Sequence, residues 1–314
     1  MKGMIIMKGF NPEGFLQYDN TQKIFTAAAL ADACAKGTIL EAMAYMCDSE
    51  HNLLVNLGSM KGIIPRDEGA LGIKEGLTKD IALISRVGKP VCFTIEAIKS
   101  DALGKRYAIL SRKKPQELCL EEIKHNCHNG DIIDAKITHL ESFGAFCDIG
   151  CGIIALLPID SISVSRISHP RDRFFVGENI RVIIKNIGDD GKITLSHKEL
   201  LGTWEENASL FQEGQTVRGI VRSIESYGIF IELTPNLAGL AEYRDGVRIG
   251  QIAAVYIKSI IPDKMKIKLI IIDTDDSQIN NAPLTYFFDP SKENHIDYWR
   301  YSPRNSIKKI ETLF

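Results

Sequence analysis

Residues 130–149 read GDIIDAKITHLESFGAFCDI, and residues 214–233 read GQTVRGIVRSIESYGIFIEL. The two stretches align without a gap. The alignment resumes downstream, where residues 177–185 and residues 250–258 each begin with Gly and end with Lys. A third and more diverged copy precedes them, between residues 36 and 114. Internal repetition of this kind indicates an array of similar units, so we expect three units in this chain.

Each unit has the pattern of short β-strands. Apolar residues alternate with polar ones over runs rich in Ile and Val, and Gly separates the runs. This is the period of half-buried strands. About five such strands can remove their exposed edges by closing into a small Greek-key barrel. The sequence therefore predicts an all-β chain of three tandem five-stranded OB-fold barrels, with short helical linkers and an N-terminal helix.

The expected organisation follows the repeats and the segments between them. A helix is predicted over residues 24–35, capped by Asn20 or Thr21 and ended by Gly37. The aromatic residues after residue 273 are expected to pack back onto the third barrel. The predicted units are an N-terminal extension with a helix (1–35), a diverged first barrel (36–114), a helical linker (115–128), a second barrel (129–198), a second helical linker (199–212), a third barrel (213–272) and an aromatic-rich C-terminal segment (273–314).

The composition excludes several classes of protein. A net charge of -2 and a pI of about 6.4 exclude a strongly basic protein that coats duplexes through charge alone. The seven cysteines form no Cys-x-x-Cys pair, which suits reduced thiols and predicts no disulfides. No apolar run approaches the roughly 18 residues of a membrane span. We expect a soluble, cytoplasmic protein without a membrane partner.

Enzymatic motifs are absent or only apparent. Residues 150–155 match the dinucleotide fingerprint, but a strand pattern follows them where a helix would be needed. His125, Cys127 and His128 lack the paired spacing of a tetrahedral metal site. The chain has no Walker loop, zinc-binding helix motif or serine elbow. The sequence therefore predicts a protein that is not an enzyme and that holds no cofactor and no metal.

The order of features within each unit resembles the S-one RNA-binding repeat, named for the largest protein of the bacterial small ribosomal subunit. The shared pattern is a Gly-led strand, the motif Phe/Tyr-Gly-x-Phe, a second Gly-led strand and a final Ile-x-Leu. The resemblance covers residues 36–272, and residues 195–207 also resemble the linker between such repeats. It implies an oligonucleotide-binding barrel in each unit, single-stranded RNA as ligand, the small ribosomal subunit as a candidate partner, and no catalysis.

Two aromatic pairs are the strongest candidates for contact with RNA: Phe143 with Phe146, and Tyr227 with Phe230. Unpaired bases stack on flat side chains, and cations beside them track the phosphates. Residues three apart on a regular strand point to opposite faces, so a kink at the intervening Gly is needed to bring both rings to one side. The alternative is that both rings belong to the barrel core, as aromatic residues in strands usually do.

Several cations accompany these rings. The resemblance implies a cationic position on the fifth strand, which falls on Lys192 and Lys266. Charge on the first strand of each unit adds further candidates, although a lone surface cation more often only solvates the fold. Two departures from the family pattern, Pro158 and Glu242 in place of His and Gly188 and Pro262 in place of Asp, predict weaker binding. The further first-strand candidates are Lys136, His139, Arg218 and Arg222.

The first unit differs from the other two. Its aromatic positions fall on His51 and Leu54, which predicts a docking module with little stacking capacity. The insert at residues 163–173 brings three Arg and His169 beside the second barrel, either flanking the ligand path or as a solvated connector. The leading hypothesis is an RNA-binding protein of translation or RNA metabolism. The alternatives are a scaffold that docks to ribosome or RNA-decay factors, and an oligosaccharide-binding protein.

Overall fold

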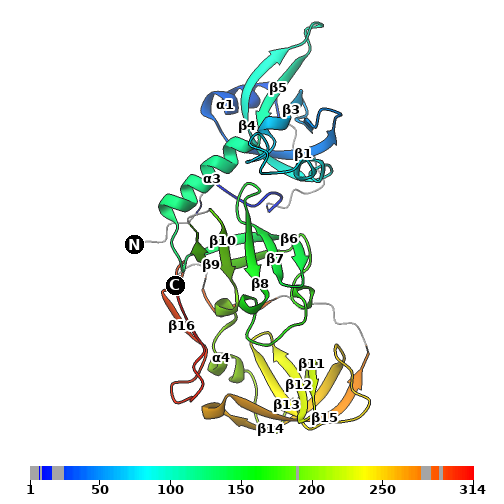
Figure 1. Cartoon of the computed structure of the whole chain (residues 1–314), viewed down its shortest axis with the longest axis vertical. Coiled ribbons are helices and arrows are strands. Elements are labelled where there is room, and N and C mark those ends of the chain that lie inside the picture. Colours follow the sequence, from blue (N-terminus) through cyan, green and yellow to red (C-terminus); the bar gives the residue numbers. More distant parts are fainter. Residues whose placement is uncertain (1–6, 8, 16–24, 189–190, 277–283, 290–292) are drawn as a thin grey trace.

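The computed structural model describes residues 7, 9–15, 25–188, 191–276, 284–289 and 293–314. Three closed barrels, each of five strands, follow one another along the long axis of the molecule (Figure 1). The first barrel lies at the top of Figure 1, the second in the middle and the third at the bottom. This arrangement confirms the prediction of three tandem five-stranded barrels.

The first barrel has the strand order β1-β2-β3-β5-β4 and closes where β1 pairs with β4. Strands β3 and β5 run parallel, and the other neighbours are antiparallel. A 3-10 turn, η1 (Arg66–Glu68), and the short helix α2 (Ile81–Ile84) connect β3 to β4. The strands are β1 (Leu40–Cys47), β2 (Leu53–Asn56), β3 (Lys61–Ile64), β4 (Pro90–Ser100) and β5 (Arg106–Ser111).

The second and third barrels repeat this topology, with the third and fifth strands of each running parallel. Two 3-10 turns lie between β8 and β9, and η5 (Pro262–Lys264) lies between β14 and β15. The second barrel consists of β6 (Ile132–Glu141), β7 (Gly144–Asp148), β8 (Ile154–Pro158), β9 (Asn179–Ile187) and β10 (Ile193–Ser196), with η2 (Ile159–Ser161) and η3 (Pro170–Asp172). The third consists of β11 (Thr216–Glu225), β12 (Gly228–Thr234), β13 (Leu237–Ala241), β14 (Ile252–Ile261) and β15 (Lys266–Asp275).

Short helices precede and join the barrels. Helix α1 (Ala27–Lys36) ends at Gly37, whose φ of 64° is left-handed as predicted. Its cap is Thr26, whose hydroxyl accepts from the Ala29 amide, so the predicted cap at Asn20 or Thr21 is wrong; those two residues lie outside the described ranges. Helix α3 (Lys113–Asn126) joins the first two barrels, and η4 (Lys198–Leu201) with α4 (Trp204–Ala208) joins the last two.

No helix within the described ranges is long and apolar enough to cross a bilayer. Each barrel instead has its own apolar core, built from the inward positions of its strands. In the second barrel Ile137, Cys147 and Leu157 are almost completely buried, so the thiol serves as a small apolar side chain. All seven cysteines carry free thiols. Burial of each large aliphatic side chain contributes about 1.5–3 kcal/mol, which makes these cores the main source of stability.

The aromatic C-terminal segment packs onto two barrels. It ends in a two-stranded sheet of β16 (Tyr298–Arg300) and β17 (Glu311–Leu313). Trp299 and Tyr301 join the core of the third barrel, as expected, and the Tyr301 hydroxyl donates to the Asn236 carbonyl. Tyr286 and Phe288, however, pack against the second barrel. The expectation of packing on the third barrel alone is therefore wrong for these two rings.

A buried ion pair joins the first and second barrels. The Glu13 carboxylate lies 2.6 Å from Nε of Arg112, and their side chains are 3% and 4% exposed. Burial raises the pKa of Glu13, but Arg112, Arg86 and the Cys92 amide together outweigh burial and hold that pKa below its ordinary value. The Glu13 amide donates to Asp148 of the second barrel, at 2.8 Å. These contacts place the N-terminal segment between the two barrels as a connecting element.

Candidate nucleic-acid interface

The aromatic pair of the second barrel lies on the outside. Phe143 directly precedes β7 and is 55% exposed. Its ring meets the ring of Phe146 edge-on, with centroids 6.0 Å apart and planes at 88°. A Cβ on Gly144 would lie 2.6 Å from the Leu157 carbonyl oxygen, so the turn depends on glycine. The glycine between the rings thus lets both lie on one side of the barrel.

The third barrel reproduces this arrangement. Tyr227 is 67% exposed, and its ring meets that of Phe230 with centroids 6.1 Å apart and planes at 88°. Gly228 has a φ of 151°, and a Cβ there would lie 2.5 Å from the Ala241 carbonyl oxygen. The near-identical geometry of the two pairs shows that the duplicated motif specifies one local structure. The alternative that these ring pairs are sealed in the cores is excluded.

The strand register shows what surrounds each pair. In the second barrel His139 of β6 lies opposite Phe146, Phe146 opposite Leu156 of β8, and Leu156 opposite Thr194 of β10. Directly opposed residues share a face of the sheet, so these side chains form an outward row. The His139 ring lies 6.4 Å from that of Phe146, and its Nε2 lies 2.7 Å from a Glu141 carboxylate oxygen. The predicted site residues Phe143, Phe146 and His139 therefore lie together.

The corresponding row of the third barrel carries a cation. Phe230 lies opposite Leu240 of β13, and Leu240 lies opposite Lys268 of β15. Lys268 and Lys266 are both exposed, because they alternate with the buried Ile267. Sequence reasoning singled out Lys266 and missed Lys268. The alternation of exposed and buried residues along the strand pointed to Lys268. Its counterpart in the second barrel is Thr194, however, so comparison of the two repeats did not show a shared cation at this position. Lys192, the counterpart of Lys266, is exposed at the start of the last strand of the second barrel.

Lys136 and Arg218 lie away from the ring pairs. The Lys136 ammonium donates to the Gly14 carbonyl at 2.5 Å, which ties the second barrel to the N-terminal segment. Arg218 lies near the start of β11, opposite Ala254, whereas Phe230 pairs near the other end of that strand. Arg218 lines a cavity of about 570 Å³ between β11, the second linker and the C-terminal segment. Neither cation belongs to the row beside the aromatic rings.

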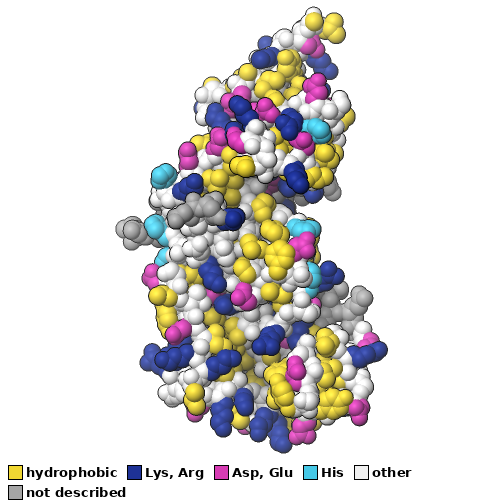
Figure 2. Space-filling view, viewed as in Figure 1, with side chains coloured by type: hydrophobic (Ala, Val, Ile, Leu, Met, Phe, Trp, Pro, Cys, Tyr) yellow, Lys and Arg dark blue, Asp and Glu magenta, His cyan; other side chains and the backbone are white. Residues whose placement is uncertain are grey.

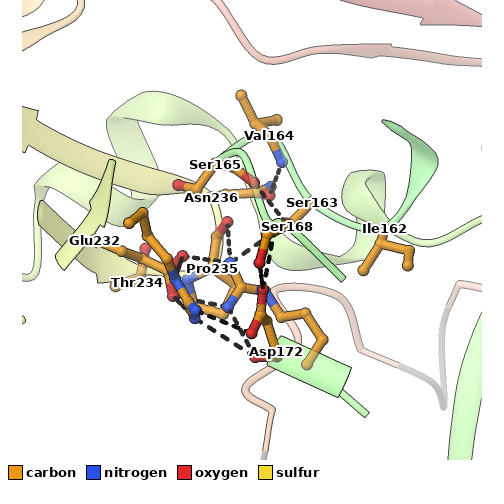
Figure 3. A network of polar contacts seen from close by, with 12 residues as sticks. Ile162, Ser163, Val164, Ser165, Ser168, Asp172, Glu232, Thr234, Pro235 and Asn236 are labelled. Atoms are coloured by element: carbon orange, nitrogen blue, oxygen red, sulfur yellow. Dashed lines mark hydrogen bonds and ion pairs between the residues drawn. The ribbon is translucent and has the colours of Figure 1, made fainter. Parts of the chain in front are cut away.

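Arg222 belongs to a buried network that joins the second and third barrels. Its Nε lies 2.9 Å from the Glu232 carboxylate, and its side chain is only 12% exposed. Arg173 of the insert donates to the same carboxylate from Nη1 and Nη2, at 2.8 and 2.5 Å, and is 3% exposed. Figure 3 shows the junction, with Asp172 and residues 163–165 of the insert beside Glu232, Pro235 and Asn236 of the third barrel. Arg222, a predicted candidate for RNA contact, is therefore engaged with Glu232 at this junction and does not lie free beside the rings.

The insert at residues 163–173 is a structural element rather than a solvated connector. His169 caps η3, with its Nδ1 accepting from the Arg171 amide at 3.1 Å, while Ser163 and Ser165 are buried. The Arg173 guanidinium also approaches the Ser163 hydroxyl and the Pro235 carbonyl, both at 3.4 Å. Sequence reasoning missed this role because Arg173 and Glu232 lie far apart in the chain and no local pattern links them.

The first barrel has no ring pair at the equivalent place. His51 precedes β2, and Leu54, at the position of Phe230, is 3% exposed. Its row continues with Ile63 and Ile109. This agrees with the expected lack of a ring pair at these two positions. Within the described ranges, no group of His, Cys, Asp and Glu side chains has the geometry of a metal site in any barrel.

The fold is a tandem array of five-stranded barrels, and the second and third barrels each present an outward pair of rings. Residues 128–198, which contain the second barrel, match the family described as the S1 RNA binding domain. The second barrel is therefore an S1 repeat, and the resemblance of the chain to the S-one repeat proteins is confirmed.

Two curated relatives extend the comparison. The small ribosomal subunit protein bS1 of Staphylococcus saprophyticus is 31% identical over 183 residues, which cover 55% of this chain and 45% of that protein. A bS1 homolog of Bacillus cereus is 27% identical over 264 residues, which cover 80% of this chain and 64% of that protein. The chain thus spans about half to two thirds of the length of these relatives.

One solved structure shows a weaker likeness. A crystal structure of a multidomain protein with nucleic acid binding domains from Streptococcus pneumoniae is 12% identical, with a TM-score of 0.25, and the match covers 78% of this chain and 76% of that one. A TM-score this low adds nothing to the barrel assignment, which rests on the strand register.

Proposed function

We propose that this protein binds single-stranded, mRNA-like RNA in translation or RNA metabolism, and that the second and third barrels make the contacts. The observation that carries the proposal is the repeated pair of outward rings, accompanied by Lys268 in the same row of the third barrel and by the exposed Lys192 and Lys266 on the last strands. Unpaired bases stack on such rings, and the ammonium groups neutralise the phosphates that follow them. The S1 repeat and the likeness to bS1 support the same ligand.

The proposed interface excludes the cations that join the barrels. Lys136 and Arg222 are engaged at the two junctions, and Arg218 lies beside the cavity. The protein would act by binding alone, without a cofactor, in the cytoplasm, with the small ribosomal subunit as a candidate partner. The likeness to small-subunit proteins supports this placement. The proposed RNA-binding residues are Phe143, Phe146, His139 and Lys192 in the second barrel, and Tyr227, Phe230, Lys266 and Lys268 in the third.

The proposal is tested by fluorescence anisotropy with a labelled, unstructured RNA. The variant Tyr227→Ala/Phe230→Ala removes both rings of the third barrel. Each stacked base contributes about 1–3 kcal/mol, so we expect binding to weaken by about tenfold or more. The control is Tyr243→Ala, which removes a ring of the same barrel that is 57% exposed and lies outside the row.

A second variant tests the charges. Lys266→Ala/Lys268→Ala should lower the slope of log affinity against log salt by about 0.7 for each phosphate that is no longer neutralised. Equal affinity of the wild type and the ring variant, with no salt dependence in either, would refute the proposal.

The scaffold alternative is supported by one observation. The corresponding row of the first barrel is aliphatic, with the buried Leu54 and the half-buried Ile63 and Ile109 at the places where the third barrel has Phe230, Leu240 and Lys268. A protein that bound only other proteins would lose no RNA affinity in either variant above. The same anisotropy experiment therefore distinguishes the two functions.

A further inference from the structure

We propose that the first barrel carries a second RNA-binding surface, separate from the ring pairs, which we name the basic strip: Lys61, Lys99, Lys105, Arg106 and Tyr107. The proposal rests on the RNA-binding function proposed above and assigns to the first barrel a phosphate-binding role in it. The positions of this barrel equivalent to the ring pairs, His51 and Leu54, take no part, whereas Tyr107 stands at the fifth-strand position that Lys192 and Lys266 hold in the other barrels.

The register brings three residues of the strip into one row. Lys99 of β4 lies opposite Tyr107 of β5, and Tyr107 lies opposite Lys61 of β3. Their neighbour Ala108 is buried in the core, so the row faces outward. Tyr107 thus lies between two lysines on three adjacent strands. A ring flanked by cations is the arrangement that holds a base and the phosphates on either side of it.

The β4–β5 hairpin extends the strip away from the barrel, and it projects at the top of Figure 1. Its tip is an ordered turn, in which the Asp101 carboxylate accepts from the amides of Leu103 and Lys105 at 2.9 and 2.8 Å. Leu103 at the tip is 93% exposed. Figure 2 shows Lys and Arg side chains on the hairpin below an apolar tip, with acidic side chains among them. The turn therefore presents Lys105 and Arg106 on a stable support.

The positive charge of the strip is neutralised only in part by the protein. Lys61, Lys99, Lys105 and Arg106 are exposed, and in the described part of the chain none of them forms an ion pair. Three acids lie near the strip: Asp101 accepts from the Lys105 amide, Asp48 has its pKa lowered by hydrogen bonds from Asn52 and also by the charge of Lys61, and Glu96 accepts from Thr94 and Lys114. The four cations outnumber the carboxylates beside them, and this excess of positive charge favours a polyanion as ligand. The ring of Tyr107 among them favours RNA over an acidic protein segment, which would have no base to stack.

The test compares two variants of equal charge. Lys61→Ser/Lys99→Ser/Lys105→Ser removes three cations of the strip, and Lys74→Ser/Lys79→Ser/Lys89→Ser removes three exposed lysines elsewhere on the same barrel. Binding is measured with an unstructured RNA of about 40 nucleotides, and with one of about 10 that occupies a single barrel or two. We expect the strip variant to bind the long RNA at least about tenfold more weakly than the control variant, with a salt slope lower by about 2.

The RNA affinities of these variants distinguish failure of the strip proposal from failure of the proposed RNA-binding function. If the strip variant and its control bind the long RNA equally while the Tyr227→Ala/Phe230→Ala variant is weakened, the strip proposal is wrong and the proposed function stands. If no variant changes RNA affinity, the proposed function itself fails. If polyglutamate binds the wild type but not the strip variant, and RNA affinity is unchanged, the strip is a protein-docking surface and the proposal is overturned. Photo-crosslinking of 4-thiouridine RNA to a peptide containing Tyr107 would support it directly.

Discussion

Glu232 is the residue whose replacement should most weaken the attachment of the third barrel. Its carboxylate, 4% exposed, accepts from Arg173 and Arg222, and the Arg173 side chain is 3% exposed. Glu232→Gln keeps the shape but leaves the Arg173 guanidinium buried without a countercharge. Removing one partner of a buried ion pair costs about 3–5 kcal/mol, because the remaining charge is neither paired nor hydrated. We expect the free energy of unfolding of the third barrel to fall by this amount.

The assay is urea denaturation followed by tryptophan fluorescence. Both tryptophans, Trp204 and Trp299, pack in the core of the third barrel, so the signal reports on that barrel. Glu242→Gln is the control, since it makes the same change of charge at an exposed position of the same barrel. A substitution at such a position changes stability by less than about 0.5 kcal/mol.

A second variant tests the physical reason for the loss. Arg173→Met/Glu232→Gln removes the buried cation together with its main acceptor, so it should be more stable than Glu232→Gln alone. The reasoning is refuted if Glu232→Gln unfolds at the same urea concentration as Glu242→Gln. It is also refuted if the double variant is no more stable than the single one.

Three further predictions concern a turn, a histidine and the thiols. Gly228→Ala should displace Tyr227 and weaken RNA binding, because the new Cβ would meet the Ala241 carbonyl oxygen; unchanged anisotropy curves would contradict this. Burial lowers the pKa of His197 to about 4, so the unfolded state binds the extra proton between about pH 6.5 and 4, and stability should fall by up to about 3 kcal/mol as the pH drops through that window. The stability difference between wild type and His197→Gln should follow this pH course, and a constant difference would refute the assignment. Burial raises the pKa of Cys119, so a thiol reagent should modify the partly exposed Cys34 in the folded protein and reach Cys119 only after unfolding, as mass spectrometry can show.

The repeats made the barrels and the outward ring pairs predictable. A motif that occurs twice, with glycine between two rings, encodes a local structure that needs no distant contact to form. It was harder to predict which residues of neighbouring strands lie opposite one another. The position of Tyr107 between Lys61 and Lys99 depends on the parallel pairing of β3 with β5 and on a bulge in β4. Nothing in the local sequence sets that register.

The junctions between barrels could not be predicted at all. Glu13 meets Arg112, and Arg173 meets Glu232, only after separate barrels have folded and docked. Charge pattern alone made Arg222 a candidate for RNA contact, whereas the folded chain uses it to hold Glu232. The helix cap at Thr26 was missed for a simpler reason, since Asn20, Thr21 and Thr26 are all of residue types that cap helices and only the fold selects among them.

A buried Arg–Glu pair lies at each of the two junctions between barrels, and these pairs have a functional consequence. Such pairs contribute little net stability compared with apolar packing, but they require one geometry in order to be satisfied. We infer that they fix the spacing between the barrels, so that an RNA bound to one barrel meets the next at a set distance rather than at an average over a flexible linker. Loosening a junction should then leave affinity for a short RNA unchanged and lower affinity for one that spans two barrels. Glu232→Gln would show this weakening even where the ring pairs are intact, because its effect is on the effective concentration of the second binding site.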